Sequence, residues 1–157
     1  MKIRSVVKTQ MVAIVFGVVA AMLSAASAAQ PTFAVGQEWS YPTRKAEVDS
    51  RLVIQRIDDH PKLGRIIHVG ILGAKLRLRP DEPPLAWTIG HMPFPEAVLR
   101  KNVTKLESAT SVAAFADFEK SYAGWKVDAD AGKKQFWTAP VAKAIDSLET
   151  MILRSRK

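Results

Sequence analysis

Apolar and polar residues alternate in short runs over residues 36–89, a pattern typical of half-buried β-strands. Strands are expected over residues 36–41, 50–57, 65–71, 75–79 and 85–89. Turn-forming residues separate these runs, among them the polar segment 58–64 and Gly73. Trp39, in the first run, is expected to fill the core of the sheet. Short consecutive strands with turn-sized gaps predict an antiparallel meander.

The apolar spacing changes to three and four residues in the second half of the chain, which indicates helices. Helices are expected over residues 95–106, from Ser111 or Val112 to Gly132, and over 140–153, with a short strand over 135–138. Pro95 suits the first turn of a helix, where a missing N–H costs nothing. The stretch 87–95 would then join the sheet to the helices. The whole pattern predicts an α+β fold, an antiparallel β-meander of four to six strands with about three helices packed on one face.

The N-terminus has the three parts of a secretory signal peptide. These are the basic residues Lys2, Arg4 and Lys8, an apolar run from Met11 to Leu23, and small residues ending at Ala28. Cleavage after Ala28, or one residue later, would release residues 29–157 as a single domain into the periplasm or the medium. The alternative is an uncleaved membrane anchor over residues 11–29, but its second half is mostly alanine and serine, which is weak for a membrane span.

Composition narrows the possible functions further. The chain has 23 basic and 15 acidic residues, and cleavage of the signal peptide leaves 20 against 15, a net charge of +5. This mild and dispersed charge argues against nucleic-acid binding and favours contact with an anionic envelope polymer or another envelope protein. Cysteine is absent, which excludes thiolate catalysis, disulfides and cysteine-bound zinc. No membrane span is expected after cleavage, and the sequence leaves the oligomeric state open.

Two segments carry a resemblance. Residues 36–44 read GQEWSYPTR, and residues 89–94 read IGHMPF, with Leu99-Arg100-Lys101 shortly after. With these segments the chain resembles a family of small uncharacterised exported bacterial proteins that share a GQxWSYxTR and an IGHMPF segment. The resemblance covers most of the chain from Phe33 onward and implies no activity. Pro42 and Pro95 depart from the family's pattern, which has a helix-capping serine at the position of Pro95.

Three residues are candidates for a site. His91, at the expected sheet-to-helix junction, could act as a general base or bind a ligand. Alternatively, its ring bonds a backbone group and pins the corner. Arg44 could clamp an anion, or it could cap local carbonyl groups or pair with Glu47 or Asp49 instead. Arg100 is a second candidate anion clamp. No metal or cofactor is expected, because the three histidines lack the spacing of metal ligands.

The other residues able to carry chemistry fit structural roles better. His60 lies in an expected turn and should be solvated, whereas His68 lies in a strand, either at the edge of the core or facing the helices. The pair Asp58–Asp59 is expected to be solvated loop charge rather than a glycosidase pair. Aromatic residues at helical spacing are expected to be mostly buried rather than to line a groove, and these are Phe115, Phe118, Tyr122 and Trp125.

These observations favour an exported, non-enzymatic binding or inhibitor-type module. The alternative is a small hydrolase or ligand-binding enzyme that uses His91, with Arg44 or Arg100 as the anion clamp. An enzyme should have a concave pocket that brings His91 near a carboxylate or hydroxyl, whereas a binding module should expose an apolar or basic patch. The chain has no serine-hydrolase or phosphate-loop motif.

Overall fold

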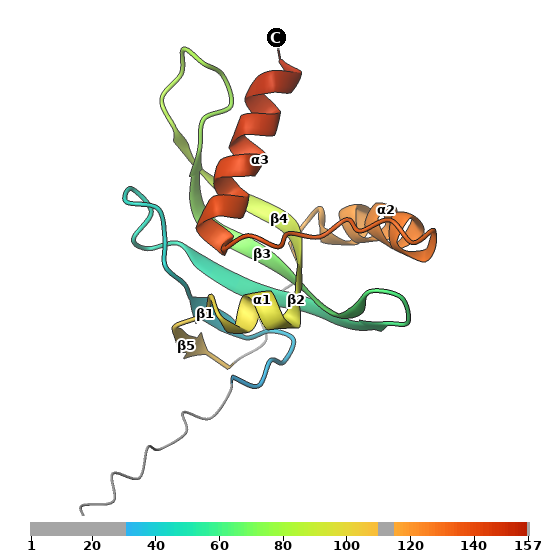
Figure 1. Ribbon diagram of the computed structural model, residues 1–157. Helices are drawn as coiled ribbons and strands as arrows, with labels where there is room; N and C mark the ends of the chain where they lie inside the picture. Colours follow the sequence, from blue (N-terminus) through green and yellow to red (C-terminus); the bar gives the residue numbers. More distant parts are fainter. Residues whose placement is uncertain (1–30, 110–114, 157) are drawn as a thin grey trace, which may run out of the picture.

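The computed structural model describes residues 31–109 and 115–156. The expected signal peptide over residues 1–28 and the expected helix start at Ser111 or Val112 lie outside these ranges. Within them the order of elements is β1 (Glu38–Ser40), β2 (Arg51–His60), β3 (Gly64–Leu76), β4 (Leu85–Pro95), α1 (Glu96–Arg100), β5 (Lys105–Ser108), α2 (Phe118–Asp130) and α3 (Val141–Ser155) (Figure 1). The predicted α+β class is confirmed. No helix in the described ranges is long and apolar enough to cross a membrane.

The five strands form one sheet in the order β4-β3-β2-β1-β5, and each neighbouring pair is antiparallel. β1 to β4 follow the predicted meander, and β5 pairs with the other side of β1. Trp39 on β1 is buried in the main core, as predicted, and its ring meets Phe33 edge-on. Because the strand order begins with β4, this strand lies at an edge of the sheet, and its free side is open to residues from other parts of the chain.

Two expected strands are one strand in the structure, so Gly73 was wrongly assigned to a turn. β3 continues through Gly73, whose φ of 67° coincides with a shift in the register between β3 and β4. Glycine adopts this left-handed conformation without strain and so accommodates the irregularity inside the strand. The expected junction at residues 87–95 is also wrong, because β4 runs to Pro95. An edge strand tolerates Pro93 and Pro95, whose missing N–H groups need not pair with a neighbour.

The expected helix over residues 95–106 is wrong beyond its first turn. It shortens to α1, and residues 105–108 return to the sheet as β5, where Leu106 pairs with Trp39. The expected strand over 135–138 is also wrong, since this segment has no strand structure. It does touch the sheet, because the backbone N–H of Trp137 donates to the carbonyl oxygen of Pro93 at 2.9 Å. The segment after α2 thus runs along the free edge of β4.

The helices lie against two sides of the sheet (Figure 1). Alternate residues of a strand face opposite sides, and α1 and α3 pack with the side that carries Ile67 and Phe94. The prediction of helices on one face holds for these two. α2 packs against the other side, where Ile66 and Trp125 belong to a second, smaller cluster. His68 shares that side with Ile66 and therefore faces a helix, one of the two alternatives that the sequence left open.

Candidate functional site

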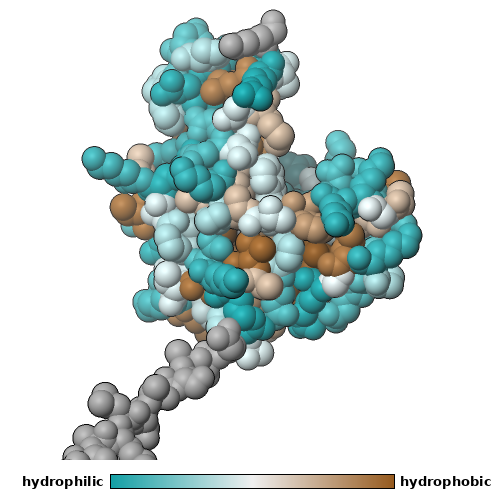
Figure 2. Space-filling model, viewed as in Figure 1, coloured by the Kyte–Doolittle hydropathy of each residue, from teal (hydrophilic) through white to brown (hydrophobic). Residues whose placement is uncertain are grey.

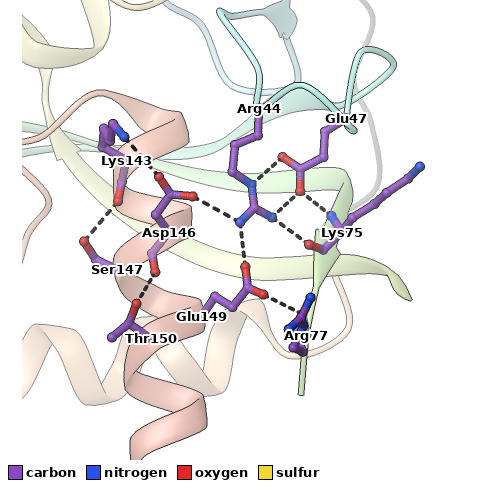
Figure 3. Close-up of polar contacts among 9 residues, drawn as sticks. All are labelled: Arg44, Glu47, Lys75, Arg77, Lys143, Asp146, Ser147, Glu149 and Thr150. Carbon is purple, nitrogen blue, oxygen red and sulfur yellow. Dashed lines mark hydrogen bonds and ion pairs between the residues drawn. The ribbon is translucent and has the colours of Figure 1, made fainter. Parts of the chain in front are cut away.

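Arg44, just after β1, is the centre of an ion-pair network that reaches α3 (Figure 3). Its guanidinium makes five hydrogen bonds, and the acceptors are the side chains of Glu47, Asp146 and Glu149 and the carbonyl oxygen of Lys75. We call Arg44, Glu47, Asp146 and Glu149 the arginine cluster. A guanidinium has five N–H donors, so none remains for an external anion. Of the partners that the sequence left open, the structure selects Glu47 and not Asp49.

Glu47 shows why the arginine cluster is structural. Its side chain is only 1% exposed, and it also accepts the backbone N–H of Lys75 on β3. A buried carboxylate without a partner would be costly, and Arg44 supplies the opposite charge. The hydrogen bond with Glu47 is the largest of the influences that raise the pKa of Arg44 further above its ordinary value. The cluster thereby fastens the segment after β1 to β3 and α3.

Arg100, the second candidate anion clamp, is also engaged inside the chain. It donates to Glu96 and to the carbonyl oxygen of Pro31, and its guanidinium lies 5.6 Å from the ring centre of Phe33. Among the described residues, no hydrogen bond, ion pair or ring contact connects Arg100 with Arg44 or His91. The three candidates from the sequence therefore do not form one site.

His91 forms a pair with a second histidine, His68. Nδ1 of His68 lies 2.8 Å from Nε2 of His91, and the two rings stack with their planes 18° apart. His68 on β3 is fully buried, and His91 on β4 is half-buried. The expectation of a backbone partner at a sheet-to-helix corner is corrected by this geometry. The ring partner is a side chain, and His91 lies inside β4.

The other nitrogen of His68 faces a carboxylate. Nε2 lies 3.2 Å from Oδ2 of Asp58, which is close enough for an ion pair but is not aligned as a hydrogen bond. Tyr122 on α2 donates its hydroxyl hydrogen to the same oxygen at 2.8 Å. The guanidinium of Arg56 lies 4.1 Å from the centre of the Tyr122 ring. We call Asp58, His68, His91 and Tyr122 the histidine cluster.

Aromatic rings from α2 shield the two imidazoles from water. Trp125 meets His68 edge-on at 4.3 Å between ring centres, and Phe118 meets His91 edge-on at 5.4 Å. Burial lowers the pKa of His91 to about 4. Burial, and then the neighbouring His91, lower the pKa of His68 to about 4, although Asp58 acts in the opposite direction. Both imidazoles are therefore neutral at pH 7.

His91 also lines a pocket bounded by α2, the edge of β4, the segment after α2, and α3. Figure 2 shows the surface hollowed between the two helices. The pocket has a volume of about 440 Å³, within the range of roughly 300–1,000 Å³ typical of small-ligand sites. Its apolar wall is formed by Trp125, Phe136, Trp137 and Met151. The imidazole of His91, which belongs to the histidine cluster, therefore borders a space large enough for a ligand.

The charged groups at this pocket differ in their pairing. Asp128 is held by Lys133 at 2.6 Å and by the side-chain amide of Gln135 at 3.3 Å. Lys134 is exposed and forms no hydrogen bond or ion pair within the described ranges. The described wall carries no hydroxyl or thiol, so it offers no serine-like nucleophile. In the part of the chain that the structure describes, no group of three His, Asp or Glu residues is placed to hold a metal ion.

Two of the sequence-based assignments near this site are wrong. Asp58, expected in a solvated turn, lies inside β2 and faces His68. His60, expected to be solvated, is buried, with Nε2 3.2 Å from Asp130. The signal that could have revealed both is the two-residue spacing of Arg56, Asp58 and His60, which continues the strand and puts these side chains on one face. The expectation that the aromatic residues are mostly buried is confirmed for Phe118 and Trp125.

No protein-family model, curated protein or solved structure matches the chain. The resemblance of residues 36–44 and 89–94 to a family of small exported proteins therefore stays a prediction. In the structure these two segments contain β1 and part of β4. A function for this chain has to be argued from the site itself.

Proposed function

We propose that this protein is a non-enzymatic binding protein that takes a small aromatic ligand into the pocket between α2, β4 and α3. The observation that carries the proposal is a wall that combines Trp125, Phe136 and Trp137 with the neutral imidazole of His91 around a volume of about 440 Å³. The wall is mixed, because polar groups lie beside the apolar residues, namely those of His91, Asp128, Lys134 and Gln135. Ligand sites combine apolar surface with placed polar groups that fix the orientation of the ligand. Aromatic rings also favour ring-shaped ligands through stacked and edge-on contacts.

The fixed orientation of the wall residues supports this proposal. His91 is held by its hydrogen bond to His68 and by the edge-on contact with Phe118. The indole N–H of Trp125 donates to the carbonyl oxygen of Gln135 at 2.6 Å, which links α2 to the segment that follows it. Side chains that are already ordered lose less conformational entropy when a ligand binds. The pocket is therefore suited to bind a ligand without rearrangement.

We further propose that the protein acts in the periplasm or outside the cell, where another envelope protein or an anionic envelope polymer could be a second partner. The support is the signal-peptide pattern that ends at Ala28 and the net charge of +5 that remains after cleavage there. N-terminal sequencing of the protein from a periplasmic extract should return Ala29 or Gln30. Recovery of an intact Met1 from the membrane fraction would contradict export with cleavage.

Titration with indole tests the pocket. We expect indole to shift the NMR signals of the Trp125 indole N–H and of the backbone amides of Phe136 and Trp137, with a dissociation constant of about 1 mM or tighter. Met151 is half-exposed on α3, so Met151→Trp should fill the pocket without harming the core, and should abolish these shifts. Trp87→Ala is the matched control, because Trp87 is equally exposed but lies outside the pocket. Absence of shifts at the pocket in the wild type would refute the proposal.

A concave pocket lined by His91 is the feature expected of an enzyme rather than of a module with an exposed patch, and the contacts that lead from His91 through His68 to Asp58 add a carboxylate. These observations favour a second candidate, a small hydrolase with His91 as general base. We place it second because a base with a pKa of about 4 takes up protons poorly at neutral pH. The described pocket wall also lacks a hydroxyl or thiol nucleophile. Hydrolysis of p-nitrophenyl acetate above the buffer rate, lost in His91→Gln, would move this candidate to first place. A rate that His91→Gln leaves unchanged would remove it.

A further inference from the structure

We propose that the histidine cluster fixes His91 as a hydrogen-bond acceptor, so that the pocket selects aromatic ligands that carry a neutral donor, a hydroxyl or an N–H. This inference rests on the proposed function, because it names the class of ligand that the same pocket takes. It depends on where the protons of Asp58, His68 and His91 lie. The protonation of Asp58 determines where His68 carries its hydrogen, and the hydrogen on His68 determines where His91 carries its own.

The first group in this series of contacts is Asp58, whose carboxylate accepts hydrogen bonds. Its Oδ2 receives the hydroxyl hydrogen of Tyr122 at 2.8 Å, and an ionised carboxylate has no hydrogen to donate. The guanidinium of Arg56, above the ring of Tyr122, adds positive charge on the same side of the sheet. The group that faces His68 is therefore negative and rich in lone pairs.

His68 must place its hydrogen toward that carboxylate. Nε2 lies 3.2 Å from Oδ2 of Asp58 and has no aligned hydrogen-bond partner among the described residues. A lone pair on Nε2 would face the lone pairs of the carboxylate, whereas an N–H is attracted to them. A neutral imidazole carries one hydrogen, so a proton on Nε2 leaves Nδ1 as an acceptor.

His91 is the last group in this series of contacts. Since Nδ1 of His68 accepts, the hydrogen in the 2.8 Å contact belongs to Nε2 of His91. The neutral ring of His91 then has its lone pair on Nδ1, and no described residue donates a hydrogen bond to that atom. Because His91 lines the pocket, this lone pair is the acceptor that the cluster offers to a ligand. A ring with an N–H or O–H can satisfy it, and the same ring with a methyl group in place of the hydrogen cannot.

The tautomers can be observed directly by long-range ¹H–¹⁵N correlation of the imidazoles in the full mature protein at pH 7. We expect both His68 and His91 to carry their hydrogen on Nε2. A hydrogen on Nδ1 of His91 would overturn the inference, since the pocket would then receive a donor. This measurement needs no ligand, so it is independent of whether any probe binds.

The ligand class is tested with indole and 1-methylindole, which share one ring system and differ in the donor. We expect the wild-type protein to bind indole about 10-fold more tightly, although the methyl group adds apolar surface. Equal affinities, or a preference for 1-methylindole, would overturn the inference and leave the proposed function standing. If neither compound binds, the proposed function and this inference both fail.

Asp58→Asn tests whether the carboxylate sets the preference at a distance. The amide of asparagine is isosteric. With its NH2 group in the place of Oδ2, it can donate one hydrogen to Nε2 of His68 and the other to the Tyr122 hydroxyl oxygen, which then accepts instead of donating. This arrangement reverses both tautomers and places a hydrogen on Nδ1 of His91. The preference for indole should then fall to about 1-fold. Asp59→Asn is the matched control, because Asp59 is the next residue of β2, is 74% exposed and pairs with Arg65. An unchanged preference in Asp58→Asn, or an equal loss in Asp59→Asn, would overturn the role assigned to Asp58.

Discussion

The arginine cluster and the histidine cluster both connect strands to a helix through polar side chains, but they differ in what they leave unpaired. Arg44 uses all five of its donors on groups of the same chain. In the histidine cluster, no described residue donates a hydrogen bond to Nδ1 of His91, and His91 lines a pocket. A closed network of charges has no donor left for a ligand, and removing one of its members destabilises the fold. An imidazole with one fixed and one free nitrogen is suited to recognition.

Removing Arg44 should have the largest effect on stability. Arg44→Ala leaves Glu47 buried without its counter-charge and close to the carboxylates of Asp146 and Glu149. We expect the free energy of unfolding to fall by about 3–5 kcal/mol. Urea denaturation followed by circular dichroism measures the change.

The matched control for Arg44→Ala is Arg79→Ala. Arg79 pairs with Glu82 at 3.1 Å, but both side chains are largely exposed, so the loss should stay within about 0.5 kcal/mol. Arg44→Lys should fall between the two, because lysine keeps the charge but not the five-donor fork. If Arg44→Ala were no more harmful than Arg79→Ala, the arginine cluster would not be the structural half of the comparison.

Lowering the pH should reduce the free energy of unfolding through the two histidines of the histidine cluster. In the unfolded chain His68 and His91 take up protons near the ordinary pKa of 6.5, whereas in the folded protein burial lowers the pKa of each to about 4. Between these values the unfolded state binds more protons, so stability is full above pH 6.5 and falls as the pH approaches 4. The slope should reach about 1.4 kcal/mol per pH unit for each histidine. Urea midpoints at pH 7, 6 and 5 measure it, and a flat profile would contradict burial of neutral imidazoles.

The same pH series in His91→Gln sharpens this prediction. Glutamine does not titrate, so the slope between pH 6.5 and 5 should lose the share of His91. It should also lose the part of the His68 shift that comes from repulsion by a second imidazolium. The charged groups that face the pair, Asp58 and Arg56, are unchanged in this variant. An identical slope in wild type and variant would show that other groups cause the pH dependence.

The sequence predicted the meander and the last helix because those elements depend on local spacing. Alternation over 50–57 is a property of neighbouring residues, and so is the three- and four-residue spacing of α3. β5 was missed because Leu106 belongs to the sheet only through its partner Trp39, far away in the chain. Helix-like spacing around residue 103 could not reveal that pairing. Gly73 was misassigned for the same reason, since its bulge is defined by β4.

The candidate site shows the same difference between local contacts, which the sequence reveals, and contacts between distant residues, which it does not. His91 was a candidate from its place in the sequence, but its partners His68, Asp58 and Tyr122 come from three other elements. Their meeting depends on the register of β2, β3 and β4 and on the packing of α2, which no spacing along the chain encodes. Arg44 was the opposite case, because its partner Glu47 lies three residues away and was named from the sequence. Local pairs can be predicted in this chain, and contacts between strands and helices cannot.

Substitution of His91 should affect stability less than Arg44→Ala does, and should affect ligand binding more. His91→Ala leaves Nδ1 of His68 without its donor, which costs about 1–3 kcal/mol, while the amide of His91→Gln can still donate and should cost less. His60→Ala is the matched control, since His60 is also buried and bonded, to Asp130, but lies outside the pocket. It should cost a similar amount and leave indole binding intact, whereas His91→Ala should weaken that binding. If both His91 variants were as stable as wild type, the predicted contribution of the His91 ring to the free energy of unfolding would be refuted. The ring would then serve the pocket alone, because functional sites often do not contribute to stability, and the hydrolysis assay would decide between binding and catalysis.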